Sequence, residues 1–280
     1  MREGISYSIL VVCLNAGQRL IDTIESIISQ SYQNYEIIIK DGESTDGSVE
    51  RVRSRFAEYM DRIRIYSQKD SGIYDAMNQA VSYAKSAKGE YYLFLNTGDS
   101  FYDEYVLEKI TDGIIEKQNE LGVCPDIVYG NMYHKALENV IYAAPQINDF
   151  TCYRNVPCHQ TCFYHKSMFA QRGYEPQYNV RADYEHFLWC FYEKKAKICY
   201  LPVMTASYEG GGYSETKEHR RQSARQHKEI TQHYMGKGKA LKYRIIMLLT
   251  LAPLRSVIAE NKYLSGLYNR LKTMIYRFKK

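Results

Sequence analysis

Three acidic residues follow short apolar runs in the first hundred residues, each where a buried strand is expected to end. Asp41 follows YEIIIK, Asp70 follows IRIYSQK and Asp99 follows YYLFLNTG. A carboxylate in such a position accepts hydrogen bonds from a nucleobase or a ribose, or binds a divalent cation. A carboxylate alone repels a phosphate, whereas Mg²⁺ or Mn²⁺ between the two groups makes the interaction attractive. Each acid also has a simpler interpretation, as a turn or helix-capping residue.

The segments that must position these acids alternate between two kinds of pattern. Continuous runs rich in β-branched residues predict strands buried on both faces, and apolar residues at helical spacing follow each run. The predicted strands are 8–14, 35–40, 63–68 and 91–95, and the predicted helices lie near 20–28, 46–56 and 74–87. This alternation predicts an α/β fold, an open, mostly parallel sheet flanked by helices. Right-handed connections then bring the carboxyl ends of the strands to one edge, where ligands bind.

The pattern changes after residue 100. Residues 131–160 are polar and are expected to be irregular. The expected elements are helix 103–119, strands 126–129, 161–164 and 198–203, helix 184–193, a glycine-rich loop at 210–212 and helix 216–235. No linker separates two independent domains in this part of the chain, so we expect a single domain over 1–235.

Several classes of protein are disfavoured by what the sequence lacks. No GxGxxG, GxxxxGK[ST] or GxSxG pattern is present, which argues against dinucleotide binding, P-loop chemistry and the hydrolase nucleophile elbow. Cys158, Cys162 and His165 invite a zinc interpretation, but their spacing matches no common zinc pattern. Seven cysteines form an odd count without framework spacing, and the short apolar run at the N-terminus has no cleavage site, so we expect a reduced, cytoplasmic protein.

Charge is distributed unevenly along the chain. Residues 231–280 contain eleven Lys and Arg and one acid, a net charge of +10, so residues 1–230 carry −5 of the total of +5. Residues 236–280 alternate apolar clusters with basic residues and are expected to form a basic amphipathic helical tail. An anionic membrane surface is the favoured partner of this tail, and packing on the domain or contact with nucleic acid are the alternatives. The longest apolar stretch, 245–254, is too short to span a bilayer.

The chain resembles a known family in four segments that occur in a fixed order. They are SILVVCLNAG, QSYQNYEIIIKDGESTDGS, QKDSGIYDAMNQA and YYLFLNTGD. They are similar to the family 2 glycosyltransferases of the GT-A fold, above all to bacterial members that build capsule, exopolysaccharide or O-antigen. The resemblance covers roughly residues 6–215 and is most specific in the first hundred. It implies that 1–100 is the nucleotide-binding half of the catalytic domain 1–235 and 101–235 its acceptor half.

The resemblance implies roles for residues at the sheet edge. Asp99 corresponds to the final acid of the family's metal-binding motif and would bind Mn²⁺ or Mg²⁺, while Asn96 stands where that motif has its first acid. The residues that the resemblance places against the nucleotide-sugar are Val12, Leu14, Asn15, Asp41, Gly42, Asp70, Gly72, Asn96 and Asp99.

Three further segments in the second half resemble functional parts of the family. His159 and Gln160 lie in PCHQTCFY, which is similar to a strand near the acceptor, although a histidine of the core is the plainer interpretation of His159. The lid of the family corresponds to the segment that contains Gly212 and Ser214. Asp183 is the first choice for the catalytic base and Glu185 the second; both are also favourable residues for the first turn of a helix.

The implied activity is that of an inverting glycosyltransferase. It would move a sugar from a UDP-sugar to a glycan or a polyprenyl-diphosphate-linked acceptor in surface polysaccharide synthesis, at the inner face of the cell membrane. Two alternatives are a sugar-phosphate nucleotidyltransferase and a non-enzymatic protein that binds lipid or RNA through its tail. A nucleotidyltransferase needs a basic, glycine-rich loop after the first strand, and this sequence lacks such a loop. Binding of RNA through the tail is disfavoured because residues 1–230 carry a net negative charge, which repels nucleic acid.

Overall fold

The computed structural model describes residues 4–84, 89–210 and 217–250. The chain divides into two compact units, 1–227 and 228–280, which are described separately. The expected lid residues Gly212 and Ser214, and the part of the expected tail from 251 onward, lie outside the described residues. Among the described residues, no helix combines the length and the apolar character needed to cross a bilayer.

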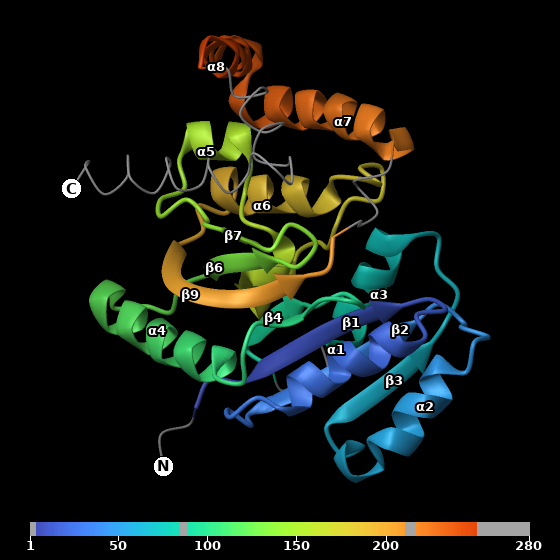
Figure 1. The fold of residues 1–280 in the computed structure, drawn as a ribbon. Helices are drawn as coiled ribbons and strands as arrows, with labels where there is room; N and C mark the ends of the chain where they lie inside the picture. The colour runs from blue at the N-terminus through green and yellow to red at the C-terminus, as the bar shows by residue number, and fades with distance from the viewer. Residues whose placement is uncertain (1–3, 85–88, 211–216, 251–280) are drawn as a thin grey trace. The chain divides into compact units, whose positions relative to one another are not determined.

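The first half of the larger unit has the alternation that the sequence predicts (Figure 1). Four parallel strands lie in the order β3-β2-β1-β4. The elements of this half are β1 (Tyr7–Cys13), α1 (Gln18–Ile28), β2 (Tyr35–Asp41), α2 (Ser48–Arg55), the 3-10 turn η1 (Ala57–Tyr59), β3 (Ile63–Ser67), α3 (Ile73–Ala84) and β4 (Tyr91–Phe94).

The central strand β1 shows why the run SILVVC forms a strand rather than a helix. All seven residues of β1 are buried, because strands pair with it on both sides and helices cover both faces. Ile9 and Val11 face the core that is shared with α1 and with α4 (Val106–Leu121). Leu10 and Val12 point to the opposite face, where α3 contacts β1. A strand covered on both faces is apolar at every position, as the sequence pattern indicates.

The second half continues the same sheet with mixed strand directions, through β4-β8-β6-β9-β5. The pairs β4–β8 and β6–β8 are antiparallel, whereas β6–β9 is parallel. The sheet is therefore parallel through its first four strands and mixed beyond them. The elements of this half are β5 (Ser100–Phe101), α4, β6 (Ile127–His134), β7 (Asn139–Ile141), α5 (Asp149–Arg154), β8 (Cys162–His165), α6 (Ala182–Tyr192), β9 (Ile198–Tyr208) and the 3-10 turns η2 (His159–Thr161) and η3 (Lys166–Phe169).

The segment 131–160 is more regular than the sequence predicts, and that expectation was wrong in part. Strand β6 continues to His134, β7 pairs with it, and α5 begins at a capping box formed by Asn148 and Thr151. The polar Asn131 fits inside the sheet region because its side-chain carbonyl accepts hydrogen bonds from the Ala143 N–H and the Tyr200 hydroxyl. A hydrogen bond between distant segments offsets the cost of burying this amide, and periodicity along the chain does not reveal it.

The last described segment, 217–250, contains two helices. Helix α7 (Lys217–Met235) runs across the boundary of the two units, and α8 (Lys237–Leu249) belongs to the smaller one. The division at 227 falls within α7, whereas the sequence places the boundary at 235. The functional separation of a catalytic domain from a tail remains a prediction.

Candidate active site

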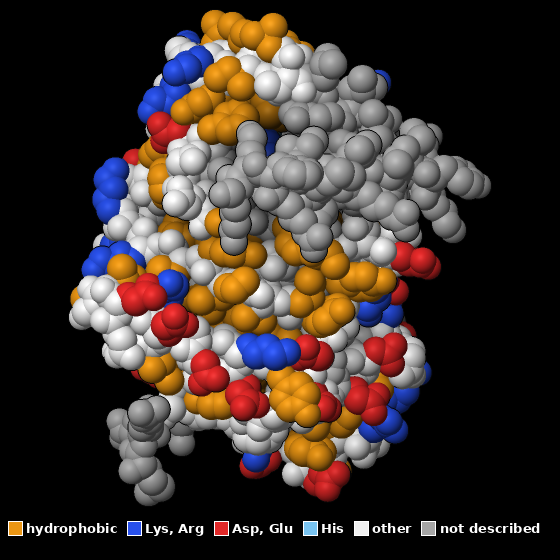
Figure 2. All heavy atoms as spheres, turned by 60° about the vertical axis from the view of Figure 1, so that its left-hand side comes forward, with side chains coloured by type: hydrophobic (Ala, Val, Ile, Leu, Met, Phe, Trp, Pro, Cys, Tyr) orange, Lys and Arg blue, Asp and Glu red, His pale blue; other side chains and the backbone are white. Residues whose placement is uncertain are grey.

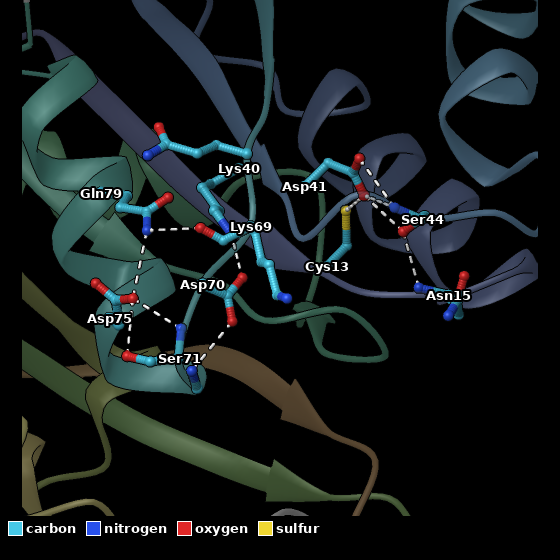
Figure 3. A network of polar contacts seen from close by, with 12 residues as sticks. Cys13, Asn15, Lys40, Asp41, Ser44, Lys69, Asp70, Ser71, Asp75 and Gln79 are labelled. Carbon is cyan, nitrogen blue, oxygen red and sulfur yellow. Dashed lines mark hydrogen bonds and ion pairs between the residues drawn. The ribbon is translucent and has the colours of Figure 1, made fainter.

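The first group of predicted residues lies where β1 and β2 end (Figure 3). Asp41 is buried, and its carboxylate accepts hydrogen bonds from the Ser44 hydroxyl at 2.5 Å and the Ser44 N–H at 3.1 Å. The Ser44 hydroxyl also accepts the Asn15 N–H at 2.8 Å, and the Asn15 side-chain oxygen accepts the Thr45 N–H at 2.9 Å. Asp41 therefore stabilises the shape of two loops at the sheet edge.

Asp70 is held at the same edge by a buried cation. Lys40 is fully buried in β2 and forms an ion pair and hydrogen bond with Asp70, whose other oxygen accepts the Gly72 N–H at 3.1 Å (Figure 3). A Cβ atom added to Gly42 would lie 3.0 Å from Asp70 Oδ2 and 3.2 Å from Leu14 Cδ1. Only glycine allows this close approach without displacement of its neighbours. The structure thus brings Leu14, Gly42 and Asp70 together, as the sequence predicts for one ligand edge.

Leu14 and Val12 have different environments although they lie on the same strand end. Leu14 is 59% exposed beside Gly42, whereas Val12 is buried in the core. An exposed apolar side chain at a ligand-binding edge offers a surface for a planar base. Val12 has no such exposure, so its place in the predicted site is that of a core residue beneath it.

Asp99 lies in the second group of predicted residues and is also buried. Its carboxylate accepts the Gln160 side-chain amide at 2.9 Å and the Glu209 backbone N–H at 3.2 Å. Burial raises the pKa of Asp99 above its usual value, although these two hydrogen bonds oppose the shift. Among the described residues no Lys or Arg forms an ion pair with Asp99, so the groups in direct contact with its carboxylate are the neutral donors of Gln160 and Glu209.

Asp183 is joined to this group through His159. The His159 ring bridges Asp183 and Asn96, with Nδ1 at 3.2 Å from Asp183 Oδ2 and Nε2 at 3.0 Å from Asn96 Nδ2. The Tyr74 hydroxyl donates to the other oxygen, Asp183 Oδ1, at 2.7 Å. Burial alone would raise the pKa of Asp183, but hydrogen bonds to its carboxylate, above all from His159 and also from Tyr74, oppose burial, and the pKa lies below its usual value. The carboxylate is therefore ionised at neutral pH, and its side chain is 27% exposed.

Glu185 lies two residues further along α6 in a different environment. Its side chain is only 4% exposed and accepts two hydrogen bonds from Arg172, at 2.8 and 2.9 Å. The Arg172 guanidinium also lies 4.6 Å from the centre of the Trp189 ring. A bidentate pair with arginine occupies both carboxylate oxygens. Of the two candidate bases, Asp183 has the accessible carboxylate.

His159 and Gln160 lie where the sequence places them, near the acids, and their side chains bind other residues of the site. The Gln160 amide is buried on Asp99, and the two nitrogens of His159 contact Asp183 and Asn96. These contacts give both side chains a role in holding the acids, and their contact with the acceptor stays a prediction. The sequence did not point to Tyr74 or Arg172, because each binds a residue that is distant along the chain. Tyr74 is 109 residues from Asp183, and Arg172 is 13 residues from Glu185.

The fold and these two groups define a class of protein. The structure is similar to that of S. aureus TarS 1–349, with a TM-score of 0.62 and 16% identity over 84% of this chain and 68% of that chain. It is also similar to the mannosyltransferase PcManGT from Pyrobaculum calidifontis, solved with GDP-Man and Mn²⁺, with a TM-score of 0.61 and 13% identity over 96% of this chain and 84% of that chain. The curled α/β sheet with flanking helices is thus the GT-A glycosyltransferase fold.

Sequence similarity narrows the class to one family. Residues 8–174 match the sequence profile described as Glycosyl transferase family 2. A PGL/p-HBAD biosynthesis glycosyltransferase of Mycobacterium bovis (strain BCG / Pasteur 1173P2) is 32% identical over 213 residues, 75% of this chain and 79% of that protein. The chain belongs to glycosyltransferase family 2.

Proposed function

We propose that this glycosyltransferase inverts the anomeric centre as it moves a sugar from a UDP-sugar to a glycan or a lipid-linked acceptor. Asp183 takes the proton of the acceptor hydroxyl as its oxygen attacks C1 of the sugar, and UDP leaves. The loops held by Asp41 and Asp70 bind the uridine, with Leu14 beneath the base. TarS has been solved with UDP and with UDP-GlcNAc, which supports a nucleotide-sugar donor of this kind.

One observation carries the proposal. Gln160 binds Asp99 and the adjacent His159 binds Asp183, so neighbouring residues of one turn connect the acid expected beside the diphosphate to the acid expected beside the acceptor. Tyr74, at the start of α3, follows directly on the loop of Asp70 and also reaches Asp183. A single-displacement transfer needs a base and a leaving-group site that are held in fixed relation to each other.

The residues around Asp99 fit a divalent cation that is shared with the donor. Among residues 4–84, 89–210 and 217–250, no three acidic, histidine or cysteine side chains form a complete metal cage. Mg²⁺ and Mn²⁺ accept one or two carboxylates when substrate phosphates supply further oxygens. Asp99, a buried carboxylate with no ion-pair partner in the described part of the chain, would hold such a cation. The cation would neutralise charge on the diphosphate leaving group.

The two alternatives from the sequence are weaker in the light of the family. A nucleotidyltransferase would release pyrophosphate from a nucleoside triphosphate, and a purely binding protein would release nothing. The nucleobase of the sugar donor is a separate question, because PcManGT was solved with GDP-Man rather than with a UDP-sugar. Incubation of the full chain and Mn²⁺ with a panel of UDP- and GDP-sugars tests all three points.

We expect slow release of UDP from one UDP-sugar even without acceptor, because water replaces the acceptor hydroxyl. Release of GDP alone would show that the donor is a GDP-sugar rather than a UDP-sugar. Release of pyrophosphate from a nucleoside triphosphate would support the nucleotidyltransferase. The absence of any nucleotide release across the panel, with added acceptors, would contradict the proposed function.

The smaller unit supports a membrane-associated site of action in the cytoplasm. Helix α8 has four exposed apolar residues whose spacing of three and four places them on one face, and basic residues flank them. In Figure 2, exposed apolar side chains lie beside Lys and Arg side chains on the smaller unit. The exposed apolar residues are Leu241, Ile245, Leu248 and Leu249, and the basic residues are Lys237, Lys239, Lys242 and Arg244. We propose that this face binds the anionic inner surface of the membrane, where a polyprenyl-diphosphate-linked acceptor would be found.

Replacing Ile245 and Leu249 together by Glu in the full chain should reduce binding to vesicles that contain phosphatidylglycerol about tenfold or more, because two apolar contacts are lost and two like charges are added. Flotation with the vesicles measures the bound fraction. Leu121→Glu, which alters an exposed leucine of α4, is the matched control and should float like the unaltered protein. Equal flotation of the α8 variant would show that α8 is not the membrane contact.

A further inference from the structure

Three side chains from separate segments form one line of hydrogen bonds. Asn96 follows β4, His159 begins η2, and Asp183 lies in the first turn of α6. The Asn96 amide nitrogen is 3.0 Å from His159 Nε2, and His159 Nδ1 is 3.2 Å from Asp183 Oδ2. His159 is 15% exposed, so the ring is largely shielded from water that would otherwise compete for its nitrogens.

The chemistry of the two end groups fixes where the imidazole carries its proton. Asp183 is ionised and only accepts hydrogen bonds, so His159 Nδ1 must carry the hydrogen that faces it. In a neutral imidazole Nε2 then has a lone pair and accepts a hydrogen. The only hydrogen available from Asn96 is on its amide nitrogen, which is the atom that faces Nε2. Each donor in the line therefore points toward Asp183.

The orientation of the Asn96 amide is consistent with this polarity. Its oxygen, Oδ1, is buried and has no hydrogen-bond partner among the described residues. For a neutral imidazole, the reverse orientation would place that oxygen against Nε2, which would then need the proton, and would leave a lone pair of Nδ1 facing the carboxylate. The arrangement with one unsatisfied acceptor avoids two facing lone pairs.

We propose that His159 is a positioning residue for Asp183, held as the Nδ1–H tautomer by Asn96. The inference rests on the proposed function in that Asp183 is the base. Tyr74 holds one carboxylate oxygen and His159 the other, so the carboxylate cannot rotate, and its remaining lone pairs keep one direction for the acceptor hydroxyl. Asn96 suits this role because, unlike the acid found at the corresponding position in the family motif, it has an N–H to donate.

The tautomer can be tested without any substrate. Long-range ¹H–¹⁵N correlation spectra of the ¹⁵N-labelled full chain distinguish Nδ1–H from Nε2–H imidazoles. His159 is one of seven histidines, and its signals are identified as those missing in the His159→Gln variant. We expect the Nδ1–H pattern for His159. An Nε2–H pattern would overturn the proposal, whatever the activity of the enzyme.

Two variants of His159 then separate positioning from general stability. Asparagine places an amide where Nδ1 lies and keeps a donor for Asp183, whereas glutamine reaches toward the place of Nε2 and loses that donor. We expect His159→Asn to retain about a tenth or more of the wild-type kcat and His159→Gln to lose about 10²-fold, with KM for the UDP-sugar unchanged in both.

The possible results are distinct. Wild-type kcat in His159→Gln, or equal losses in both variants accompanied by weaker UDP binding, would overturn the positioning role. If the wild-type chain itself turns over no nucleotide-sugar, the proposed function fails, and the tautomer measurement still decides the arrangement of protons. Thermal unfolding of each variant shows whether it is folded; if His159→Gln is not, the tautomer of the wild-type protein decides, with its signals identified from His159→Asn.

Discussion

Replacing Asp183 by Asn should lower kcat about 10²–10⁴-fold and leave UDP affinity unchanged. The amide cannot take a proton from the acceptor hydroxyl, whereas it keeps an oxygen that accepts the Tyr74 hydroxyl bond. The pKa of Asp183 lies below its usual value, so the wild-type carboxylate is ionised throughout the neutral range. The amide of the variant does not titrate in this range, so a change of pH should not restore its activity. Steady-state release of UDP with acceptor present measures kcat, and calorimetry measures UDP binding.

Glu185→Gln is the matched control, because it removes the other candidate carboxylate from the same helix. Its expected effect is on folding, since Arg172 loses the charge of its buried partner; breaking such a pair costs about 3 kcal/mol of stability. Its kcat below the unfolding temperature should stay within about threefold of the unaltered enzyme. A large loss of kcat in Glu185→Gln together with near-normal turnover in Asp183→Asn would assign the base to Glu185 instead.

Replacing Asp99 by Ala should abolish the effect of Mn²⁺ on UDP binding. Asp99 is the proposed protein ligand of the cation, and without it the edge of the sheet has no carboxylate there to hold Mn²⁺ beside the diphosphate. Calorimetry of UDP binding with and without Mn²⁺ should show at least about a tenfold gain in affinity in the unaltered protein and none in the variant.

Asp103→Ala serves as the comparison, since Asp103 is an acid of the same segment that pairs at the surface with Lys109 at 2.8 Å. It should keep the full Mn²⁺ effect. Because Asp99 also accepts the Gln160 amide, thermal unfolding is measured for both variants. A folded Asp99→Ala protein whose UDP affinity still rises with Mn²⁺ would remove Asp99 from the metal site.

Sequence patterning determined the first half of the fold. The runs that become β1, β2 and β4 are mostly apolar because each of these strands is paired on both sides and buried, and such burial leaves a nearly continuous pattern in the chain. Strand β3 lies at the edge of the sheet and is only partly buried. The meeting of Leu14, Gly42 and Asp70 followed from topology alone, since strand ends in this arrangement share an edge.

The second half was harder to read because its structure depends on contacts between distant residues. Asn131 is a polar residue within β6, and it is stabilised by Tyr200 and by Ala143. Antiparallel strands such as β8, with only four residues, leave a pattern too short to give their direction. The sequence predicted most of the elements here but not the order in which they join the sheet.

The sequence by itself determined the family, the candidate acids and the edge at which the first group lies. Only the tertiary structure decided what each acid does there: Glu185 is bound to Arg172, Asp99 to Gln160, and Asp183 to His159. The reason is physical. Residue type and spacing fix how a segment folds and which face it buries, whereas the charge state and accessibility of a carboxylate depend on donors that folding brings from elsewhere in the chain.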